Sequence, residues 1–434
     1  MNLSKYFFDK FFAYSILLFP LFLFLGPLIA ELFLLLIIIY SFFLNSYKKQ
    51  IAVDKKYIIL FGLFYLSTLS STLINYYNFD YSKSGIFFIR IVLFSSAISI
   101  ILRSIHLKTR KILILYNIFF SIIIIDALIQ YYFGKNLLNY EMIKGRVSSF
   151  LKEELILGSF LFKTIPIFLV YIVLNDQLRE KKKFFFYLIL LSFISLVIFI
   201  SGERTSFFLL LLFYFILFLL LNNLRKFIFY LCLMFLFLII VVTFIFKSNY
   251  TNSSSRMFIK TYNQILVFSD KEIKDDKKII KKVNFFSPDH QSHYELSLKI
   301  IKDHLFIGTG VKGFRYLCRN KIYILDKKND GCSTHPHNTF IQIFTSNGLI
   351  GFLLFLIAYL YIIYEIFNSR KKTDLSDKLF NLNVSKQIIL VGLFVNFWPF
   401  APSGNFFNNW LSIFYFYQIG LYLYLKNENK TKIS

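Results

Sequence analysis

Long apolar stretches alternate with short polar ones along most of the chain. A helix needs about 20 apolar residues to cross the hydrocarbon of a bilayer, so each long stretch predicts one transmembrane helix. The predicted spans lie near residues 11–26, 28–45, 57–74, 84–102, 112–132, 153–174, 184–201, 205–221, 227–246, 338–367, 387–400 and 406–425. The pattern therefore predicts an all-α polytopic membrane protein with about twelve transmembrane helices. The first two spans, joined by Gly26-Pro27, are also compatible with a re-entrant pair.

The composition agrees with this class. The 434 residues are 57% hydrophobic and 21% aromatic, and the mean hydropathy of +0.60 excludes a soluble domain. We expect no cleavable signal peptide, because residues 11–25 lack a small-residue cleavage site.

Basic residues are concentrated in every second loop, whereas the alternate loops carry few. They lie near residues 48–56, 103–111, 179–183, 225–226, 370–372 and 426–432. Because basic loops remain in the cytoplasm, the pattern predicts a multi-pass protein with both termini cytoplasmic. The net charge of +25 then reflects contact with anionic membrane lipids, and nucleic acid is not an expected partner.

This orientation divides the chain into three parts. Residues 1–246 are predicted to hold nine transmembrane helices, and residues 338–434 three more and a short cytoplasmic tail. Between them, residues 247–337 form one large external loop with short helices, which is the periplasmic face in a bacterium. One of these helices is predicted near residues 293–304, and Gly308-Thr309-Gly310 is predicted to be a turn or helix stop.

Cys318 and Cys332 both lie in this loop. An oxidising compartment favours a disulfide between them over two free thiols. In the chain-entropy model such a bond contributes roughly 3 kcal/mol. It would also restrain the polypeptide that leads to His335 and His337.

The segment His335-Pro336-His337-Asn338 lies where the loop re-enters an apolar helix. A neutral imidazole at His337 can accept a proton from a hydroxyl nucleophile, and Pro336 restricts the conformation of His335. The helix that follows is expected to direct free N–H groups at an anionic ligand. Gly348, about 16 Å further along, is a place for the span proper to begin. The alternative is that the histidines only cap an interfacial helix.

Three arginines are predicted to lie on the external side. Arg204 follows Glu203 in a short turn, Arg256 is near the start of the large loop, and Arg146 precedes a span. Arginine binds phosphate oxygens in a bidentate manner, so all three are candidate diphosphate ligands. The alternatives are a Glu203–Arg204 ion pair that anchors the turn, and solvated charges at the other two positions.

Three further ionisable residues, Arg90, Asp126 and Lys163, fall in the outer halves of predicted spans. Such residues usually face a cavity or one another. Asp126 is expected to pair with Arg90 or Lys163. The group indicates either a partly cationic cavity for a diphosphate headgroup or one structural ion pair.

Taken together, these features resemble the O-antigen ligase and O-antigen polymerase superfamily of bacterial membrane glycosyltransferases. The most specific part is His337-Asn338, nine residues, Gly348, two residues and Gly351, which fits the ligase pattern. Residues 303–310, residues 405–410 and the arginine turn at Arg204 are also similar to segments of that family. The match at Arg256 rests on its position in the loop.

The resemblance implies an inner-membrane enzyme that works on the periplasmic face and needs no metal or other cofactor. Its donor would be a glycan linked to undecaprenyl diphosphate. A ligase would transfer this glycan to a sugar hydroxyl of lipid A–core, and a polymerase to another lipid-linked glycan. His337 would be catalytic, and Arg204 and Arg256 would contact the diphosphate. A transporter or flippase of lipid-linked sugars is a further alternative, although no inverted repeat is visible.

Overall fold

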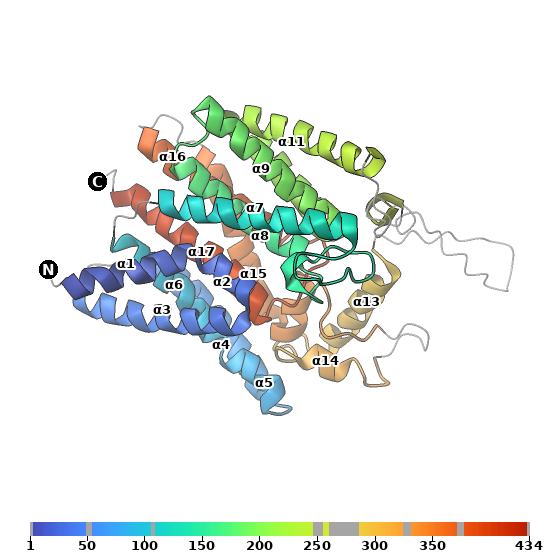
Figure 1. The fold of residues 1–434 in the computed structure, drawn as a ribbon. Helices are drawn as coiled ribbons and strands as arrows, with labels where there is room; N and C mark the ends of the chain where they lie inside the picture. Colours follow the sequence, from blue (N-terminus) through green and yellow to red (C-terminus); the bar gives the residue numbers. More distant parts are fainter. Residues whose placement is uncertain are drawn as a thin grey trace, which may run out of the picture.

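The computed structural model describes residues 3–48, 54–105, 109–245, 255–259, 286–323, 331–370 and 377–431. In these ranges the chain folds into helices and loops without a β-strand, which confirms the predicted all-helical membrane class (Figure 1). Residues 246–254 and 260–285, most of the first half of the predicted external loop, lie outside the described ranges.

The long helices form one bundle, and two shorter ones, α13 and α14, lie at one end of it (Figure 1). The helices are α1 (Leu3–Leu17), α2 (Phe19–Leu25), α3 (Pro27–Lys48), α4 (Lys55–Ile74), α5 (Phe79–Ile86), α6 (Ile89–Arg103), α7 (Arg110–Phe133), α8 (Leu157–Leu174), α9 (Lys181–Ile200), α10 (Arg204–Leu220), α11 (Arg225–Ile240), α13 (Pro288–Asp303), α14 (Gly313–Leu317), α15 (Thr339–Arg370), α16 (Asp377–Asn396) and α17 (Asn409–Thr431). Short 3-10 or π turns occur at Ser149–Leu151, Asn222–Leu224, Val241–Ile245 and Ser255–Ile259.

Among the described residues, eight helices are long and apolar enough to cross a membrane. A ninth span is added if α1 and α2, which meet at a bend of 63°, count as one. Each of the twelve predicted spans overlaps a helix, and α10 is an apolar helix slightly shorter than a full span. The count of twelve therefore stays a prediction.

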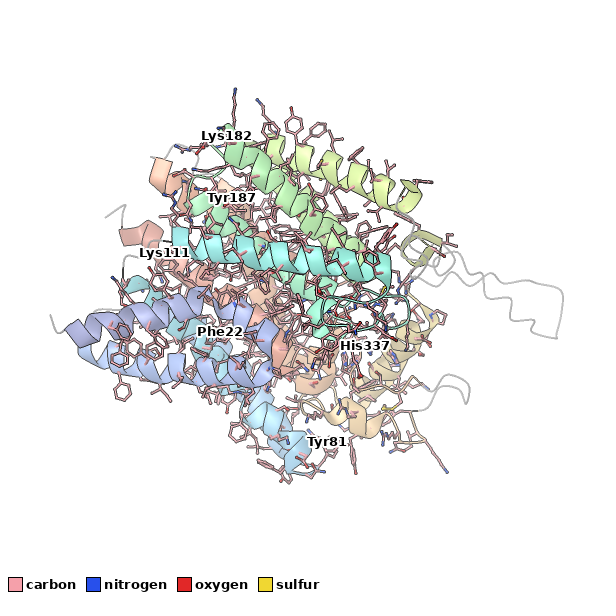
Figure 2. The ribbon with its side chains drawn as sticks, in the orientation of Figure 1. Phe22, Tyr81, Lys111, Lys182, Tyr187 and His337 are labelled. Atoms are coloured by element: carbon pink, nitrogen blue, oxygen red, sulfur yellow. A yellow bond between two sulfur atoms is a disulfide. The ribbon has the colours of Figure 1, made fainter. Side chains whose placement is uncertain are left out.

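The two ends of the bundle differ in character. Both chain termini lie at one end, as do Lys111 and Lys182, whereas His337 lies at the opposite end beside α13 (Figures 1 and 2). The termini and the histidines therefore lie at opposite ends of the bundle, and the side of the membrane that each end faces stays a prediction.

Helix α8 forms the centre of the bundle. In α8, 89% of the apolar 18-residue segment that could cross a membrane is buried within the protein, compared with 28% in α4 and 28% in α15. Most of the surface of α4 and α15 is therefore available for contact with lipid. A helix that is packed on all sides is a rigid support. The start of α8 is therefore a fixed platform for the residues that pack on it.

Helix α15 is broken at Gly348, whose φ of 65° and ψ of −166° are not helical. The break is packed against Gly308, since a Cβ on Gly348 would lie 2.3 Å from the carbonyl oxygen of Phe306. The backbone N–H of Leu349 donates to the carbonyl of Leu305 at 2.8 Å. Both glycines have a positive φ, so no larger residue fits either position without strain. The family-like spacing thus marks a helix break held by the external loop.

Candidate active site

His337 lies immediately before α15, in a left-handed conformation with φ of 58°. Its carbonyl oxygen accepts a hydrogen bond from the N–H of Ser403 at 2.8 Å. A hydrogen bond of 3.0 Å joins its Nε2 to Ser333 Oγ. Backbone and ring are therefore fixed from two sides. Non-glycine residues rarely adopt a positive φ unless the surroundings hold them there, which is common at functional sites.

Three other histidines surround the His337 ring, and we call the four residues the histidine cluster. The ring centroid of His337 lies 4.0 Å from that of His335, 5.2 Å from that of His293 and 5.6 Å from that of His290. His290 and His293 come from α13, one turn apart on the same face. His337 is thus the centre of the histidine cluster.

Burial favours the neutral form of His290, His335 and His337. It is the largest cause of the lowering of the His337 pKa to about 3, and the neighbouring His335, His293 and His290 contribute to the same shift. Burial also lowers the pKa of His335 to about 4. In the described part of the chain, no three His, Cys, Asp or Glu side chains are arranged to hold a metal ion. The arrangement is therefore suited to accepting hydrogen bonds from a neutral ligand group.

His335 and Asn338 fix the polypeptide around His337. His335 Nε2 donates to the carbonyl of Ser403 at 3.4 Å, and its Nδ1 lies 2.9 Å from Thr334 Oγ1. Asn338 Oδ1 accepts the N–H groups of Phe340 and Ile341 at 3.0 and 3.1 Å. We expected the start of α15 to offer free N–H groups to an anion, and for these two groups that expectation is wrong, because the asparagine caps them.

The three arginines singled out in the sequence converge on the turn between α9 and α10, and we call them the arginine cluster. Arg146 Nε donates to the carbonyl of Ser201 at 3.2 Å, and Arg256 Nε to that of Gly202 at 2.9 Å. Arg204 is the first residue of α10, in the same turn. A Cβ on Gly202 would lie 3.1 Å from Arg256 Cδ and 3.4 Å from Arg146 Cγ. The glycine therefore lets two arginines close on the turn from both sides.

Glu203 is the acidic residue of this turn, and its carboxylate is already engaged. Its two oxygens accept the N–H groups of Gly158 at 2.7 Å and Ser159 at 3.0 Å, at the start of α8. Arg146 approaches it to 3.7 Å. Burial raises the pKa of Glu203, while Arg146, the two N–H groups and Lys163 lower it. One carboxylate thus faces several cations, and the arginine cluster keeps an excess of positive charge.

The arginine and histidine clusters lie next to each other. Burial lowers the pKa of His290, and the charges of His293 and Arg204 lower it further. Arg204 is therefore close enough to His290 for their charges to interact. Residues that are far apart in the sequence, on α10 and α13, come together at one end of the bundle.

Lys163, on the same side of α8 as the turn, donates from Nζ to Ser159 Oγ at 2.7 Å. It lies one helical turn below the N–H groups that Glu203 binds. The positive charge of Lys163 contributes to lowering the pKa of Glu203. The structure therefore places Lys163 beneath the arginine cluster.

Arg90 has a different environment. Its guanidinium makes two hydrogen bonds of 3.1 Å to the carboxylate of Glu31 on α3. It also donates to Asn409 Oδ1 at 3.0 Å. The expected pairing of Asp126 with Arg90 or Lys163 is not what the structure shows, because Asp126 Oδ1 accepts the N–H of Leu137 at 2.9 Å. Asp126 organises the loop after α7, which the hydropathy pattern treated only as a connection.

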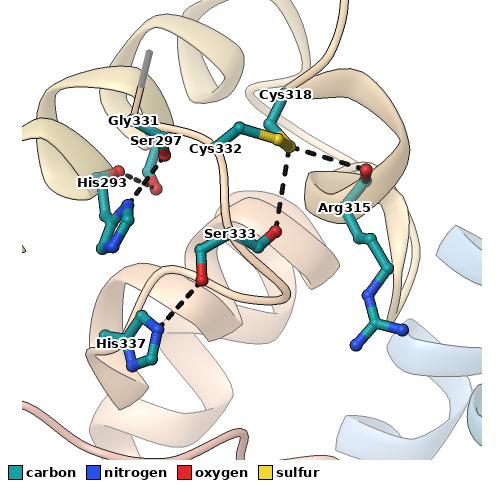
Figure 3. Close-up of a disulfide and its surroundings, with 8 residues drawn as sticks. All are labelled: His293, Ser297, Arg315, Cys318, Gly331, Cys332, Ser333 and His337. Atoms are coloured by element: carbon teal, nitrogen blue, oxygen red, sulfur yellow. Dashed lines mark hydrogen bonds between the residues drawn. A yellow bond between two sulfur atoms is a disulfide. The ribbon is translucent and has the colours of Figure 1, made fainter. Parts of the chain in front are cut away.

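Cys318 and Cys332 form a disulfide beside the histidine cluster (Figure 3). Cys332 precedes Ser333, the hydrogen-bond partner of His337. On the other side of Cys332, the carbonyl of Gly331 accepts a hydrogen bond of 2.8 Å from His293 Nδ1. The disulfide therefore anchors the segment that carries the hydroxyl next to His337.

Sequence reasoning identified His337 and the arginines but missed His290 and His293. The one available signal was the helical pattern near residues 293–304. The helix begins earlier, at Pro288, with Ser287 as its cap. Both histidines are partly buried on this helix, and placing them beside His337 required knowledge of where the helix starts.

Part of the chain matches a known protein family. Residues 187–356 match the family model described as O-Antigen ligase. This range is less than half of the chain, and it covers Arg204, Arg256, His335, His337 and Asn338 but not Arg90, Arg146 or Lys163. No curated protein matches the chain. Residues 187–356 are therefore similar to an O-antigen ligase domain, and this similarity supports the predicted resemblance to the O-antigen ligase and polymerase superfamily.

Proposed function

We propose that this protein transfers a glycan from undecaprenyl diphosphate to a sugar hydroxyl of lipid A–core on the periplasmic face of the inner membrane. One observation carries the proposal, namely the histidine cluster centred on His337 beside the arginine cluster at one end of the bundle. The first offers hydrogen-bond acceptors to a hydroxyl. The second offers cations to a diphosphate.

The reaction is an inverting displacement at the anomeric carbon. The acceptor oxygen forms the new C–O bond while the bond from that carbon to the diphosphate oxygen breaks, and the electron pair leaves with undecaprenyl diphosphate. With a pKa of about 3, His337 is a weak base toward a hydroxyl in the unliganded protein. Its first role is to accept the hydroxyl hydrogen bond and direct the oxygen. The proton moves to the imidazole only as the C–O bond forms and the hydroxyl becomes acidic.

Stabilisation of the departing diphosphate is the larger contribution. Arginines bind phosphate oxygens with two donors each and retain their charge at any pH of interest. Arg146 and Arg256 are oriented through their Nε atoms by backbone carbonyls. Cations that are positioned before the reaction lower the barrier without reorganising, which is the source of large electrostatic rate enhancements. No cofactor is part of this proposal, so transfer is expected to continue in a chelator.

A polymerase that joins lipid-linked glycans is the alternative, and the matched family supports both. The same residues would serve it in the same roles. The identity of the acceptor separates the two, since a ligase lengthens lipid A–core and a polymerase lengthens the chain on undecaprenyl.

The test is glycan transfer by purified protein given an undecaprenyl-diphosphate oligosaccharide and lipid A–core. His337→Asn is the informative variant, because asparagine tolerates the left-handed backbone at this position better than alanine does. We expect a loss of about 10²- to 10⁴-fold in kcat. His304→Ala, at the end of α13, is the matched control and should stay near wild type. Full transfer by His337→Asn would remove His337 from the mechanism.

A further inference from the structure

Arg315 is a cation near the histidine cluster that neither the sequence motifs nor the proposed mechanism uses. It lies on α14 between the buried residues Phe314 and Cys318. The disulfide fixes the end of this short helix. At its beginning, a Cβ on Gly313 would lie 2.5 Å from the side chain of Thr309. The backbone of Arg315 is therefore held in place, and Figure 3 shows its side chain extending away from the disulfide.

One donor of the Arg315 guanidinium has no partner among the residues that the structure describes. This donor, Nε, is buried. The nearest charge on its own segment, Lys312, is also positive, and burial together with Arg315 lowers the pKa of Lys312. A buried polar atom without a partner is costly, and an arginine cannot relieve that cost by losing its proton. Such a group is suited to binding an anion.

The position of Arg315 relative to the histidine cluster indicates which reactant it faces. Helix α14, which carries Arg315, packs against α13 and α15, and the disulfide ties its end to the segment that carries Ser333, the hydrogen-bond partner of His337. In agreement with this, the charge of Arg315 contributes to the lowered pKa of His335, whereas that of Arg204 contributes to the lowered pKa of His290. His335 comes from the loop before α15 and His290 from α13, and their ring centroids lie 4.0 Å and 5.6 Å from that of His337. Cationic residues on two separate helices, α14 and α10, therefore lie near the histidine cluster.

We propose that Arg315 binds an oxyanion, a phosphate or a carboxylate, on the acceptor glycolipid and so holds the acceptor on the His335 side of the histidine cluster. This inference rests on the proposed function, since it assigns the other reactant to the arginine cluster. In a displacement the acceptor oxygen and the leaving diphosphate lie on opposite faces of the anomeric carbon. Two separate cationic sites near one set of imidazoles are suited to that requirement, with the buried Nε of Arg315 supplying one of two parallel donors to the oxyanion.

The first test is kinetic. Arg315→Gln removes the charge and keeps most of the side-chain volume. We expect it to raise KM for the acceptor by at least tenfold, with KM for the donor changed less than twofold. Arg315→Lys, which keeps the charge without the planar fork, should recover part of the loss. Arg319→Ala removes one positive charge from an exposed position four residues further on and is the matched control. A rise in KM for the donor instead would place Arg315 with the leaving group and overturn the proposal.

The second test measures equilibrium binding, so it does not depend on transfer. The probes are lipid A–core, the same lipid after phosphatase treatment, and the same lipid after reduction of its carboxylates. Wild-type protein should bind one of the treated lipids at least tenfold more weakly than the untreated lipid, which also names the oxyanion. Arg315→Gln should bind the treated and untreated lipids equally. Equal binding of all three lipids by wild type, absence of binding, or a preference that survives in Arg315→Gln would refute the assignment.

The two tests separate this inference from the proposed function. Transfer by wild type without any acceptor effect of Arg315→Gln would leave the function standing and remove the inference. Loss of oxyanion discrimination in Arg315→Gln, with no transfer by wild type to any acceptor, would support the site while contradicting the function.

Discussion

The arginine cluster and Arg90 use the same side chain in opposite ways. Arg90 gives two hydrogen bonds to Glu31 and one to Asn409, so its charge is matched by a carboxylate and its donors are used by helices α3 and α17. In the arginine cluster, one carboxylate faces Arg146 while it caps the start of α8. Arg256 instead donates to a backbone carbonyl. A carbonyl orients a guanidinium but does not neutralise it.

This difference separates a structural arginine from a ligand-binding one. A neutralised guanidinium joins helices and has little attraction left for an anion. A guanidinium that is oriented only by backbone carbonyl groups keeps its charge available for an anionic ligand. The sequence placed Arg90 and Arg204 together as candidates for the diphosphate, and Arg90 stays an untested prediction in that role. The contacts of Arg90 favour a structural role.

The largest expected effect comes from Arg204→Ala. We expect transfer to fall by about 10²- to 10³-fold, because a cation that stabilises the leaving group is lost. Thermal stability should change little, and Arg204→Lys should be intermediate because it lacks the fork. Steady-state rates and melting curves of the three proteins provide the measurement. If Arg204→Ala lowered stability and left transfer intact, Arg204 would be a structural arginine and not a ligand-binding one.

The next effect is that of Gly202→Ala. A Cβ at this position meets Arg256 Cδ at 3.1 Å and Arg146 Cγ at 3.4 Å, and the positive φ of 69° adds backbone strain. Both guanidiniums should shift, and we expect transfer to fall by roughly tenfold, because small misplacements at a reacting centre are costly. Gly62→Ala, in α4 with open space around it, is the matched control. Equal activity of the two variants would show that the arginines adapt.

Arg90→Ala should show the opposite pattern. We expect the protein to lose roughly 1–3 kcal/mol of stability, because Glu31 keeps its charge in a partly buried site without its partner. Transfer per folded molecule should stay within about twofold. The double variant Arg90→Ala/Glu31→Ala should recover part of the stability, since it leaves no unpaired charge. A fall in kcat that the double variant does not repair would move Arg90 into the ligand-binding group.

The smallest effect concerns pH. His335 and His337 have pKa values lowered to about 4 and about 3, whereas the unfolded chain protonates histidine near about 6.5. As the pH falls below that value, the unfolded state binds protons that the folded state does not, so stability decreases. We expect a loss of roughly 1 kcal/mol per pH unit between about pH 6 and 4.5, allowing for the partial exposure of His337. Denaturation in that range should become less pH-dependent in His335→Gln/His337→Asn. An unchanged pH dependence in that variant would show that other groups control it.

Hydropathy and charge spacing predicted the helices, because each transmembrane helix must satisfy its own backbone hydrogen bonds in the bilayer and this requirement is local in sequence. The sequence analysis predicted that the span proper begins at Gly348, and the structure shows a break in α15 at that residue, because the strained glycine and the cap at Asn338 are local features. The histidine cluster could not be predicted in the same way. It depends on α13 packing beside the start of α15, which no local pattern encodes.

The partners of buried charges were the least predictable part. Asp126 binds Leu137 because the chain after α7 folds back over its own helix end. Arg90 finds Glu31 because α3 and α6 pack together. Arg315 gave no signal, since a lone arginine in a polar loop looks like a solvated charge. In each case three-dimensional proximity decided the partner.

The broken helix α15 has a consequence for how sequence change is tolerated. Asn338 fixes one end of its first segment through the cap, and the Gly308–Gly348 contact fixes the other. One added or deleted residue between them would turn one end against the other by about 100° and displace it by about 1.5 Å. The imidazole of His337 would then point away from its partners with every side chain of the segment unchanged. The number of residues in this segment sets the orientation of His337 relative to the glycine contact. We therefore expect substitutions within the segment to be tolerated far better than insertions or deletions.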